Sequence, residues 1–179
     1  MTLARRPEPP PAADTQPPAR EPRGAARPAP VTGATPDSAQ SDRAASDEAR
    51  RWYRRHRMEP LGADARVEPL LAADEAVLVS CPASLLVTAN GPTQRCPLGN
   101  LYLTSSRLLH LGAETVVVDL DTIGEVMLQG DALSMTTRDG DAILLEVEEP
   151  RLLRVQIAAA RMARRRRAET RPAARAGDR

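Results

Sequence analysis

The chain has 179 residues and a formal net charge of +1, and its 25 basic residues are all arginine. No stretch approaches the roughly 18 apolar residues of a membrane-spanning helix, and prolines stand where a secretory signal would have its apolar segment. These features exclude a membrane-spanning or secreted protein and predict a cytoplasmic one.

The first residues have the composition of a disordered segment. Residues 1–45 hold 10 of the 17 prolines and show no apolar periodicity. Such a segment cannot bury enough apolar surface to offset the entropy of ordering it. We therefore expect a disordered Pro/Ala/Arg-rich arm over residues 1–45. Its run Pro7-Glu8-Pro9-Pro10-Pro11 fits a groove that binds polyproline helices, but a solvated tail is the simpler interpretation.

Residues 75–147 have the pattern of an antiparallel sheet. Short runs rich in Val, Leu, Ile and Thr recur there between turn residues. Side chains alternate along a strand, so Leu101 and Leu103 project to one face, and Tyr102 and Thr104 to the other. The turns are marked by Gly112, by Gly130-Asp131 and, with the strongest short hairpin signal, by Asp139-Gly140.

After residue 147 the apolar period becomes helical. Pro150 suits the first position of a helix, and Glu148 and Glu149 suit the positive end of its dipole. Arginines share one side of this helix, and the opposite side is a wide apolar stripe that must cover something, most simply one end of the sheet's core. The stripe consists of Leu152, Leu153, Val155, Ile157, Ala159, Ala160 and Met162.

Three segments, 75–81, 99–111 and 116–123, resemble a GRAM domain. The most specific is Gly99-Asn100-Leu101-Tyr102-Leu103-Thr104, followed by Arg107 and Leu108, because a glycine entering such a strand is the hallmark of that family. The resemblance, to a short single-domain protein of the bacterial type, implies a pleckstrin-homology-like fold. That fold is mainly β, with a barrel of six or seven antiparallel strands capped by a C-terminal helix, and it is usually a docking module.

The predicted division of the chain has four parts. A disordered arm over 1–45 is followed by a short basic helix and linker over 46–63, with Ser46 as its cap and Asp47 in its first turn. The GRAM-like domain with its C-terminal helix covers 64–167, and a disordered basic tail covers 168–179. Charge follows this division, because residues 64–160 carry 6 Arg and 14 acidic residues, a net charge of −8, between basic ends.

Two clusters concentrate the positive charge, and three interpretations of them stay open. They contact an anionic membrane surface, or they bind nucleic acid through phosphates and base stacking. In the third interpretation they have no binding role: they neutralise the acidic barrel while Trp52 packs into a groove on it, or they are simply solvated. The candidate binding residues are Arg50, Arg51, Trp52, Tyr53, Arg54, Arg55 and Arg57 in the first cluster, and Arg161, Arg164, Arg165, Arg166 and Arg167 in the second.

Specific recognition of a phosphoinositide headgroup is not expected. In the pleckstrin-homology type, several converging basic residues of the first hairpin hold the phosphates. Here the corresponding loop, residues 88–98, offers Arg95 alone within an acidic domain.

Residues for catalysis or metal binding do not form a recognised pattern. Cys81, Cys96 and His110 are too few and too widely spaced for structural zinc, and the default for both cysteines is a reduced thiol. We expect no enzyme activity, no cofactor and no metal. Arg107 is predicted to be structural, pairing with a carboxylate or a turn carbonyl.

The sequence thus predicts a non-enzymatic binding or adaptor module. A peptide or protein would dock on the barrel, in the groove that this fold usually has between a sheet edge and the helix, while the basic flanks contact an acidic partner or an anionic membrane. The alternative is a nucleic-acid-binding protein that uses the arginine-rich flanks, with the barrel as scaffold. Neither the identity of the protein partner nor the oligomeric state follows from the sequence.

Overall fold

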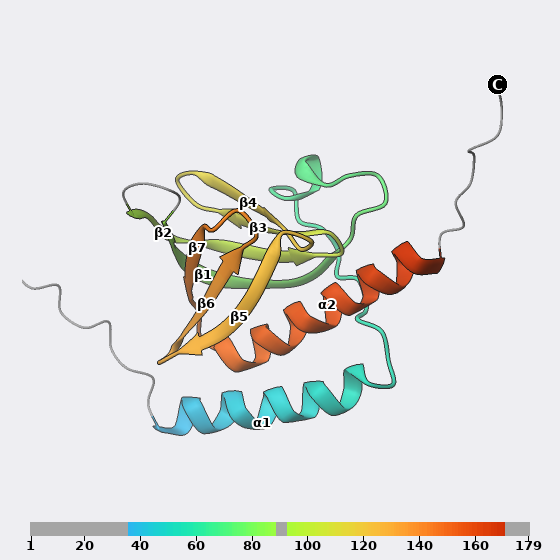
Figure 1. The fold of residues 1–179 in the computed structure, drawn as a ribbon, viewed down its shortest axis with the longest axis horizontal. Helices are drawn as coiled ribbons and strands as arrows, with labels where there is room; N and C mark the ends of the chain where they lie inside the picture. The colour runs from blue at the N-terminus through green and yellow to red at the C-terminus, as the bar shows by residue number, and fades with distance from the viewer. Residues whose placement is uncertain (1–35, 89–92, 171–179) are drawn as a thin grey trace, which may run out of the picture. The chain divides into compact units, whose positions relative to one another are not determined.

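The structure, a computed structural model, describes residues 36–88 and 93–170. Within them the chain forms two α-helices, a short 3-10 helix and seven β-strands (Figure 1). In chain order these are α1 (Pro36–Tyr53), η1 (Glu68–Leu70), β1 (Val77–Thr88), β2 (Thr93–Thr104), β3 (Arg107–Leu111), β4 (Thr115–Asp119), β5 (Ile123–Gln129), β6 (Ala132–Thr137), β7 (Ala142–Glu146) and α2 (Pro150–Thr170).

The strands form one antiparallel sheet in the order β4-β3-β2-β1-β7-β6-β5. Neighbours in the sheet are also neighbours in the chain, except where β7 returns to pair with the second half of β1. The two edge strands, β4 and β5, follow each other in the chain without pairing. The predicted fold class, a mainly β protein with six or seven antiparallel strands and a C-terminal helix, is confirmed, and the strands number seven in the described residues.

Alternation along β2 separates two apolar clusters, as the sequence predicts. Leu101 and Leu103 belong to the main core inside the curved sheet. Tyr102 points to the other face and packs in a smaller cluster with Val67 and Leu109. The segment before β1 therefore covers the outer face of β2 and β3, and both faces of this hairpin are buried.

Turn glycines lie where the sequence places them. Gly130 and Gly140 have φ angles of 62° and 91°, in the left-handed region that favours glycine. The first hairpin differs from the expectation, because β2 begins at Thr93 and most of the predicted loop over 88–98 is strand. Cys96 pairs with Leu85 in this stretch and is buried in the core, which explains why the ladder extends so far.

Gly99 is required by a close approach of backbone and side chain. A Cβ added there would lie 2.5 Å from the carbonyl oxygen of Leu111 and 2.9 Å from Nε2 of His110. We expect Gly99→Ala to lower the free energy of unfolding by about 1–2 kcal/mol, because the backbone of β3 must move. Urea denaturation measures this. Gly62→Ala is the matched control, since a Cβ at Gly62 meets no atom within 4 Å. Equal stability of the two variants would contradict the prediction.

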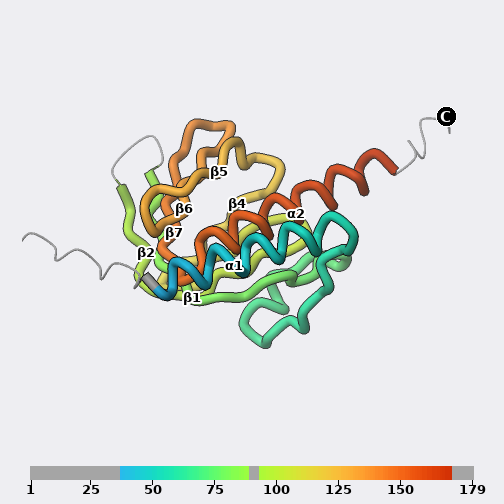
Figure 2. Tube along the Cα trace, turned by 90° about the horizontal axis from the view of Figure 1, so that it is seen from below, coloured from blue at the N-terminus to red at the C-terminus, as the bar shows by residue number. Residues whose placement is uncertain are grey.

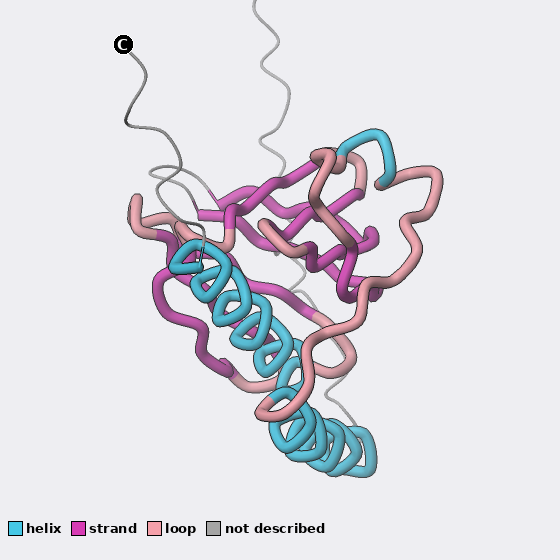
Figure 3. The backbone as a smooth tube through the Cα atoms, turned by 90° about the vertical axis from the view of Figure 1, so that its right-hand side faces the viewer, coloured by secondary structure: helices cyan, strands magenta, loops and turns pink. Residues whose placement is uncertain are grey.

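Helix α2 is buried on two sides. Leu153, Ile157 and Ala160 join the core of the sheet. Val155 is also buried, yet it lies about 200° around the helix from Leu153 and is not part of that core. Figures 1 and 3 show the reason, since α2 runs between the sheet and α1, which packs along it. The wide apolar stripe predicted from the sequence therefore covers the sheet on one side and is covered by α1 on the other.

The end of that stripe was predicted wrongly. Met162, which the sequence places on the apolar face, is 55% exposed. Met162 lies two turns beyond Val155 and about 20° from it around α2, on the side away from the sheet, so the sheet does not cover this side chain.

Helix α1 corrects the predicted boundary of the disordered arm. It begins at Pro36, so residues 36–45 are helical, and residues 1–35 lie outside the described residues. Ser46 is not a cap but a buried residue in the middle of the helix, where its hydroxyl donates to the carbonyl of Arg43 at 2.8 Å. Asp37, not Asp47, is the acidic residue of the first turn. The tail predicted over 168–179 also begins later than expected, because α2 continues to Thr170, and residues 171–179 lie outside the described residues.

Candidate functional site

The first cluster lies at the C-terminal end of α1 and in the turn that follows it. The helix ends at Tyr53. In the turn that follows, the backbone N–H groups of Arg55 and His56 both donate to the carbonyl of Trp52. The imidazole of His56 stacks on the indole of Trp52, with ring centroids 3.8 Å apart. Trp52 remains 51% exposed, so the interpretation that it packs into a groove on the barrel is wrong. Tyr53 beside it is half-buried.

A buried carboxylate joins α1 to α2. Asp42 accepts hydrogen bonds from the backbone N–H groups of Arg151, at 3.0 Å, and Leu152, at 2.9 Å. The first N–H groups of a helix lack partners within the helix, and a carboxylate there also interacts favourably with the helix dipole. Here the capping carboxylate comes from a residue 109 positions earlier in the chain. This contact fixes where α1 begins to pack on α2.

The two helices run in the same direction from that contact. Figures 1 and 2 both show the N-terminal ends of α1 and α2 on one side and their C-terminal ends on the other. Arg50 lies about 12 Å beyond Asp42 along α1, and Arg161 lies about 15 Å beyond Arg151 along α2. The structure therefore brings to one end of the helix pair two clusters that are separate in the sequence.

Some of these arginines are already used within the protein. The guanidinium of Arg161 donates to the carbonyls of Ile123 and Gly124 at the start of β5. Arg164 forms an ion pair with Asp121 at 2.7 Å, and Arg50 pairs with Asp47 at 3.0 Å. For Arg161 and Arg164 the structure thus supports the interpretation that they contact the barrel.

The remaining arginines form what we call the helix-end surface. Within residues 36–88 and 93–170, their side chains make no ion pair and no hydrogen bond. These residues are Arg51, Arg54, Arg55, Arg57, Arg165, Arg166 and Arg167, and they are exposed. Their role in binding stays a prediction.

A groove lies between α2 and the edge strand β5. It has a volume of about 300 Å³, and its walls combine small or apolar residues with charged ones. The lining residues are Gly124, Glu125, Val126, Arg154, Ile157, Ala158 and Arg161. Because β5 is the last strand of the sheet, its outer edge pairs with no other strand of the described chain. The groove predicted between a sheet edge and the helix is therefore present.

Arginines outnumber carboxylates among the charged residues described at this groove. Burial lowers the pKa of Arg161, and the nearby charges of Arg165 and Arg138 lower it further, whereas Asp121 opposes them. Arg138 comes from the turn after β6, so it joins the site from the sheet. Sequence reasoning missed Arg154 as a groove residue and Arg138 as a charge near the groove, because no sequence signal indicates which turn lies near the helix.

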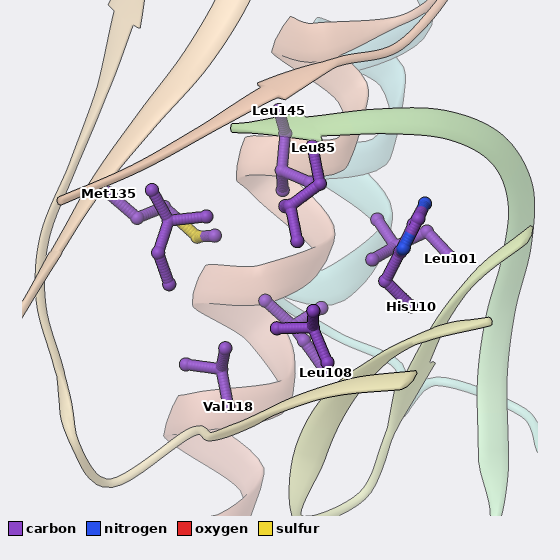
Figure 4. Close-up of a pocket in the computed structure, with 9 residues that line it drawn as sticks. Leu85, Leu101, Leu108, His110, Val118, Met135 and Leu145 are labelled. Atoms are coloured by element: carbon purple, nitrogen blue, oxygen red, sulfur yellow. The ribbon is translucent and has the colours of Figure 1, made fainter. Parts of the chain in front are cut away.

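The core of the sheet encloses a second, much smaller cavity (Figure 4). It is lined by Leu101, Leu108, His110 and other core residues and measures about 10 Å³, close to the least that a water molecule needs. His110 shares a hydrogen bond at 3.0 Å with the carbonyl of Ala83, while its Nδ1 meets no protein partner within the described residues. The cavity is too small to bind an organic ligand.

The role predicted for Arg107 is confirmed. Its guanidinium donates to the carboxylate of Glu75, with a shortest distance of 2.7 Å, and to the carbonyl of Leu70 at 2.6 Å. Hydroxyl groups of Thr104 and Ser106 also donate to Glu75. Burial raises the pKa of Glu75, but these donors lower it more, to about 2. The network ties the segment before β1 to the β2–β3 turn and is structural.

Neither cysteine is arranged for catalysis or for a disulfide. Cys81 pairs with Leu101 and Cys96 with Leu85 in the β1–β2 ladder, and both thiols are free. Burial, assisted by the charge of Glu149, raises the pKa of Cys81 to about 11, so its thiol is protonated at neutral pH. Among the described residues, no three His, Cys, Asp or Glu side chains meet as metal ligands, and neither α-helix has the length and apolarity to cross a membrane.

Solved structures that are similar to this chain include pleckstrin-homology (PH) domains. No protein-family model matches the chain, and no curated protein matches it either. Among solved structures, the Vps36 N-terminal PH domain is 17% identical with a TM-score of 0.42, covering 64% of this chain and 95% of that one. The N-terminal PH domain of human ARAP2 is 16% identical with a TM-score of 0.37, covering 56% and 90%. The C-terminal domain of an unknown protein from Leishmania infantum is 17% identical with a TM-score of 0.40, covering 52% and 90%.

The fold is pleckstrin-homology-like. The order of its strands and the C-terminal helix that covers the sheet carry this assignment. TM-scores below 0.5 and identities of 16–17% add no argument about function. Function must therefore be argued from the surfaces of this protein.

Proposed function

We propose that this protein is a non-enzymatic binding module of the GRAM type, and that it docks an extended, acidic segment of a partner protein in the groove between β5 and α2. The observation that carries this proposal is the unpaired edge of β5 beside a groove that contains Arg154 and Arg161.

The backbone of β5 supports binding of an extended segment. An exposed sheet edge offers a row of N–H and C=O groups to which another strand adds, and pockets beside it select alternate side chains. The side chain of Arg161 occupies the first two carbonyls, of Ile123 and Gly124. The partner strand is therefore expected along residues 125–129, with its inward side chains against Val126 and Ile157.

Charge supports an acidic partner. Arg154 and Arg161 line the groove, and Arg138 and Arg165 lie close enough to affect the pKa of Arg161. Glu125 is the one acidic residue among the lining residues, so positive charge prevails. Residues 64–160 as a whole carry a net charge of −8, which repels an acidic peptide elsewhere on the barrel and favours this groove.

A peptide library tests the proposal directly. Random dodecamer peptides displayed on phage are selected on the full chain, and the affinity of selected peptides is measured by fluorescence anisotropy. We expect enrichment of Asp and Glu alternating with β-branched residues. Ala158→Glu places a longer, negative side chain in the groove at an exposed position of α2, and it should weaken binding at least tenfold, about 1.4 kcal/mol.

The matched control is Val117→Glu on the other edge strand, β4, where the side chain is also exposed. This variant should bind selected peptides with unchanged affinity. If Val117→Glu abolishes binding and Ala158→Glu does not, the partner adds to β4, and the proposed site is wrong. Selection of basic peptides, or of none, would also contradict the proposal.

A further inference from the structure

We infer that the helix-end surface of α1 and α2 is a single membrane-contacting site, which holds the protein on an anionic bilayer with Trp52 at the level of the lipid headgroups. This inference does not rest on the proposed function, because Arg165 is the one arginine that the helix-end surface shares with the charges described near the peptide groove.

Convergence of the two clusters is the first observation. Asp42 fixes the N-terminal end of α2 against α1, and the helices run in the same direction from there (Figure 2). A membrane thus meets arginines from both helices together. Binding through two linked clusters is much tighter than through either one, because the second contact becomes intramolecular.

Unpaired charge is the second observation. The seven arginines of the helix-end surface have no carboxylate partner among the described residues, whereas Arg50, Arg161 and Arg164 do have internal contacts. The planar guanidinium group binds phosphate oxygens through two hydrogen bonds at once, and it loses less hydration than an ammonium group. These arginines are therefore available to the phosphates of lipid headgroups.

Exposed apolar side chains favour a bilayer over a nucleic acid. Trp52, near the end of α1, stands between Arg51 and Arg54, which is in the following turn, and Met162 stands between Arg161 and Arg164 in α2. Both are more than half exposed. An aromatic ring and a thioether gain by entering the interface between headgroups and acyl chains. A single-stranded nucleic acid would stack a base on Trp52, but it offers Met162 no comparable apolar environment.

The distribution of charge sets the orientation. Residues 64–160 have a net charge of −8, while residues 161–179 have a net charge of +6. An anionic surface attracts the helix ends and repels the body of the sheet. The protein would therefore sit with the helix ends down and the sheet away from the membrane.

Trp52 provides the test, because it is the single tryptophan of the chain. The full chain is mixed with vesicles of phosphatidylcholine, with or without about 30% phosphatidylserine. With the anionic vesicles at low salt, we expect a blue shift of the emission and protection from acrylamide. High salt or neutral vesicles should give neither change.

Variants test whether the surface is one site. Arg51/Arg54/Arg55→Ala and Arg165/Arg166/Arg167→Ala should each lower vesicle affinity by about 100-fold, since each arginine near an anionic surface contributes roughly fivefold. The charge-matched control removes three exposed arginines elsewhere, Arg43, Arg66 and Arg95, and should change affinity less than fivefold.

Three results would overturn the inference. Emission that does not change with anionic vesicles would exclude contact at Trp52. Full binding by one of the two triple variants would show that the clusters do not act together. A change of emission with an oligothymidine, but not with the vesicles, would assign the surface to single-stranded nucleic acid instead.

Discussion

Replacing Glu75 with glutamine should lower the free energy of unfolding at neutral pH by about 3 kcal/mol. The side chain of Glu75 is 2% exposed, and its carboxylate accepts hydrogen bonds from Arg107, Thr104, Ser106 and the backbone N–H of Ala72. Removing one partner of a buried ion pair leaves the other charge uncompensated, at a cost of about 3–5 kcal/mol. We expect a loss at the lower end of this range, because the Arg107 side chain is 25% exposed and water can partly solvate its charge.

This effect depends on pH with a defined sign. The pKa of Glu75 is about 2 in the folded protein, against an ordinary value of 4.5. A carboxyl with a lowered folded pKa contributes its stability fully above the unfolded pKa, and the contribution is lost as pH falls. The difference between the wild-type protein and Glu75→Gln should therefore be largest above pH 4.5 and should shrink between pH 4.5 and about 2.

Chemical denaturation at neutral and acidic pH measures both parts of this prediction. Glu59→Gln is the matched control, because Glu59 is exposed. The free energy of unfolding of this variant should lie within about 0.5 kcal/mol of the wild-type value at each pH. A constant difference between Glu75→Gln and the wild-type protein at all pH values would show that the charge of Glu75 does not stabilise the fold.

Asp42→Ala should detach α1 from α2 and destabilise the protein by about 2 kcal/mol. The substitution leaves two N–H groups at the start of α2 without their acceptor. Loss of a capping side chain costs about 0.5–2 kcal/mol, and hydrogen bonds to a charged group contribute about 1.5–3 kcal/mol. The residues of α1 that face α2 are small or polar, such as Ala45, Ser46 and Ala49, so few apolar contacts remain to hold the helix.

Limited trypsin digestion and thermal unfolding check this prediction. Release of α1 should speed cleavage after Arg43 and Arg50, while the sheet stays intact. Asp47→Ala, on the same helix, removes only an exposed ion pair with Arg50 and should leave both measurements almost unchanged. Since the cap aligns the two basic clusters, Asp42→Ala should also weaken vesicle binding. Unaltered digestion of Asp42→Ala would mean that α1 is held by other contacts.

The sheet was largely predictable because its signals are local. Alternation placed Leu101 and Leu103 on the core side of β2 and Tyr102 on the other, as the structure has them. Glycine turns at 130 and 140 followed from backbone conformations that few other residues adopt. The partners of Arg107 were also predicted by kind, a carboxylate and a turn carbonyl.

The beginning of α1 has only a weak signal in the local sequence. Pro36 suits the first position of a helix and residues 37–45 hold no proline or glycine, but an isolated helix of this kind gains little from its own residues. Its stabilising contact is Asp42 against the N-terminus of α2, a partner 109 residues away. No periodicity in the sequence indicates such a contact.

By itself, the sequence determined the strands, the turns, the second helix and the separation of an acidic sheet from basic ends, since periodicity and charge are properties of neighbouring residues. Only the tertiary structure decided that α1 packs parallel to α2, that the two arginine clusters lie at the same end of the helix pair, and that Arg138 lies close to Arg161 beside β5. The physical reason is that a buried cap and a shared surface depend on which distant residues come together, and packing alone fixes that.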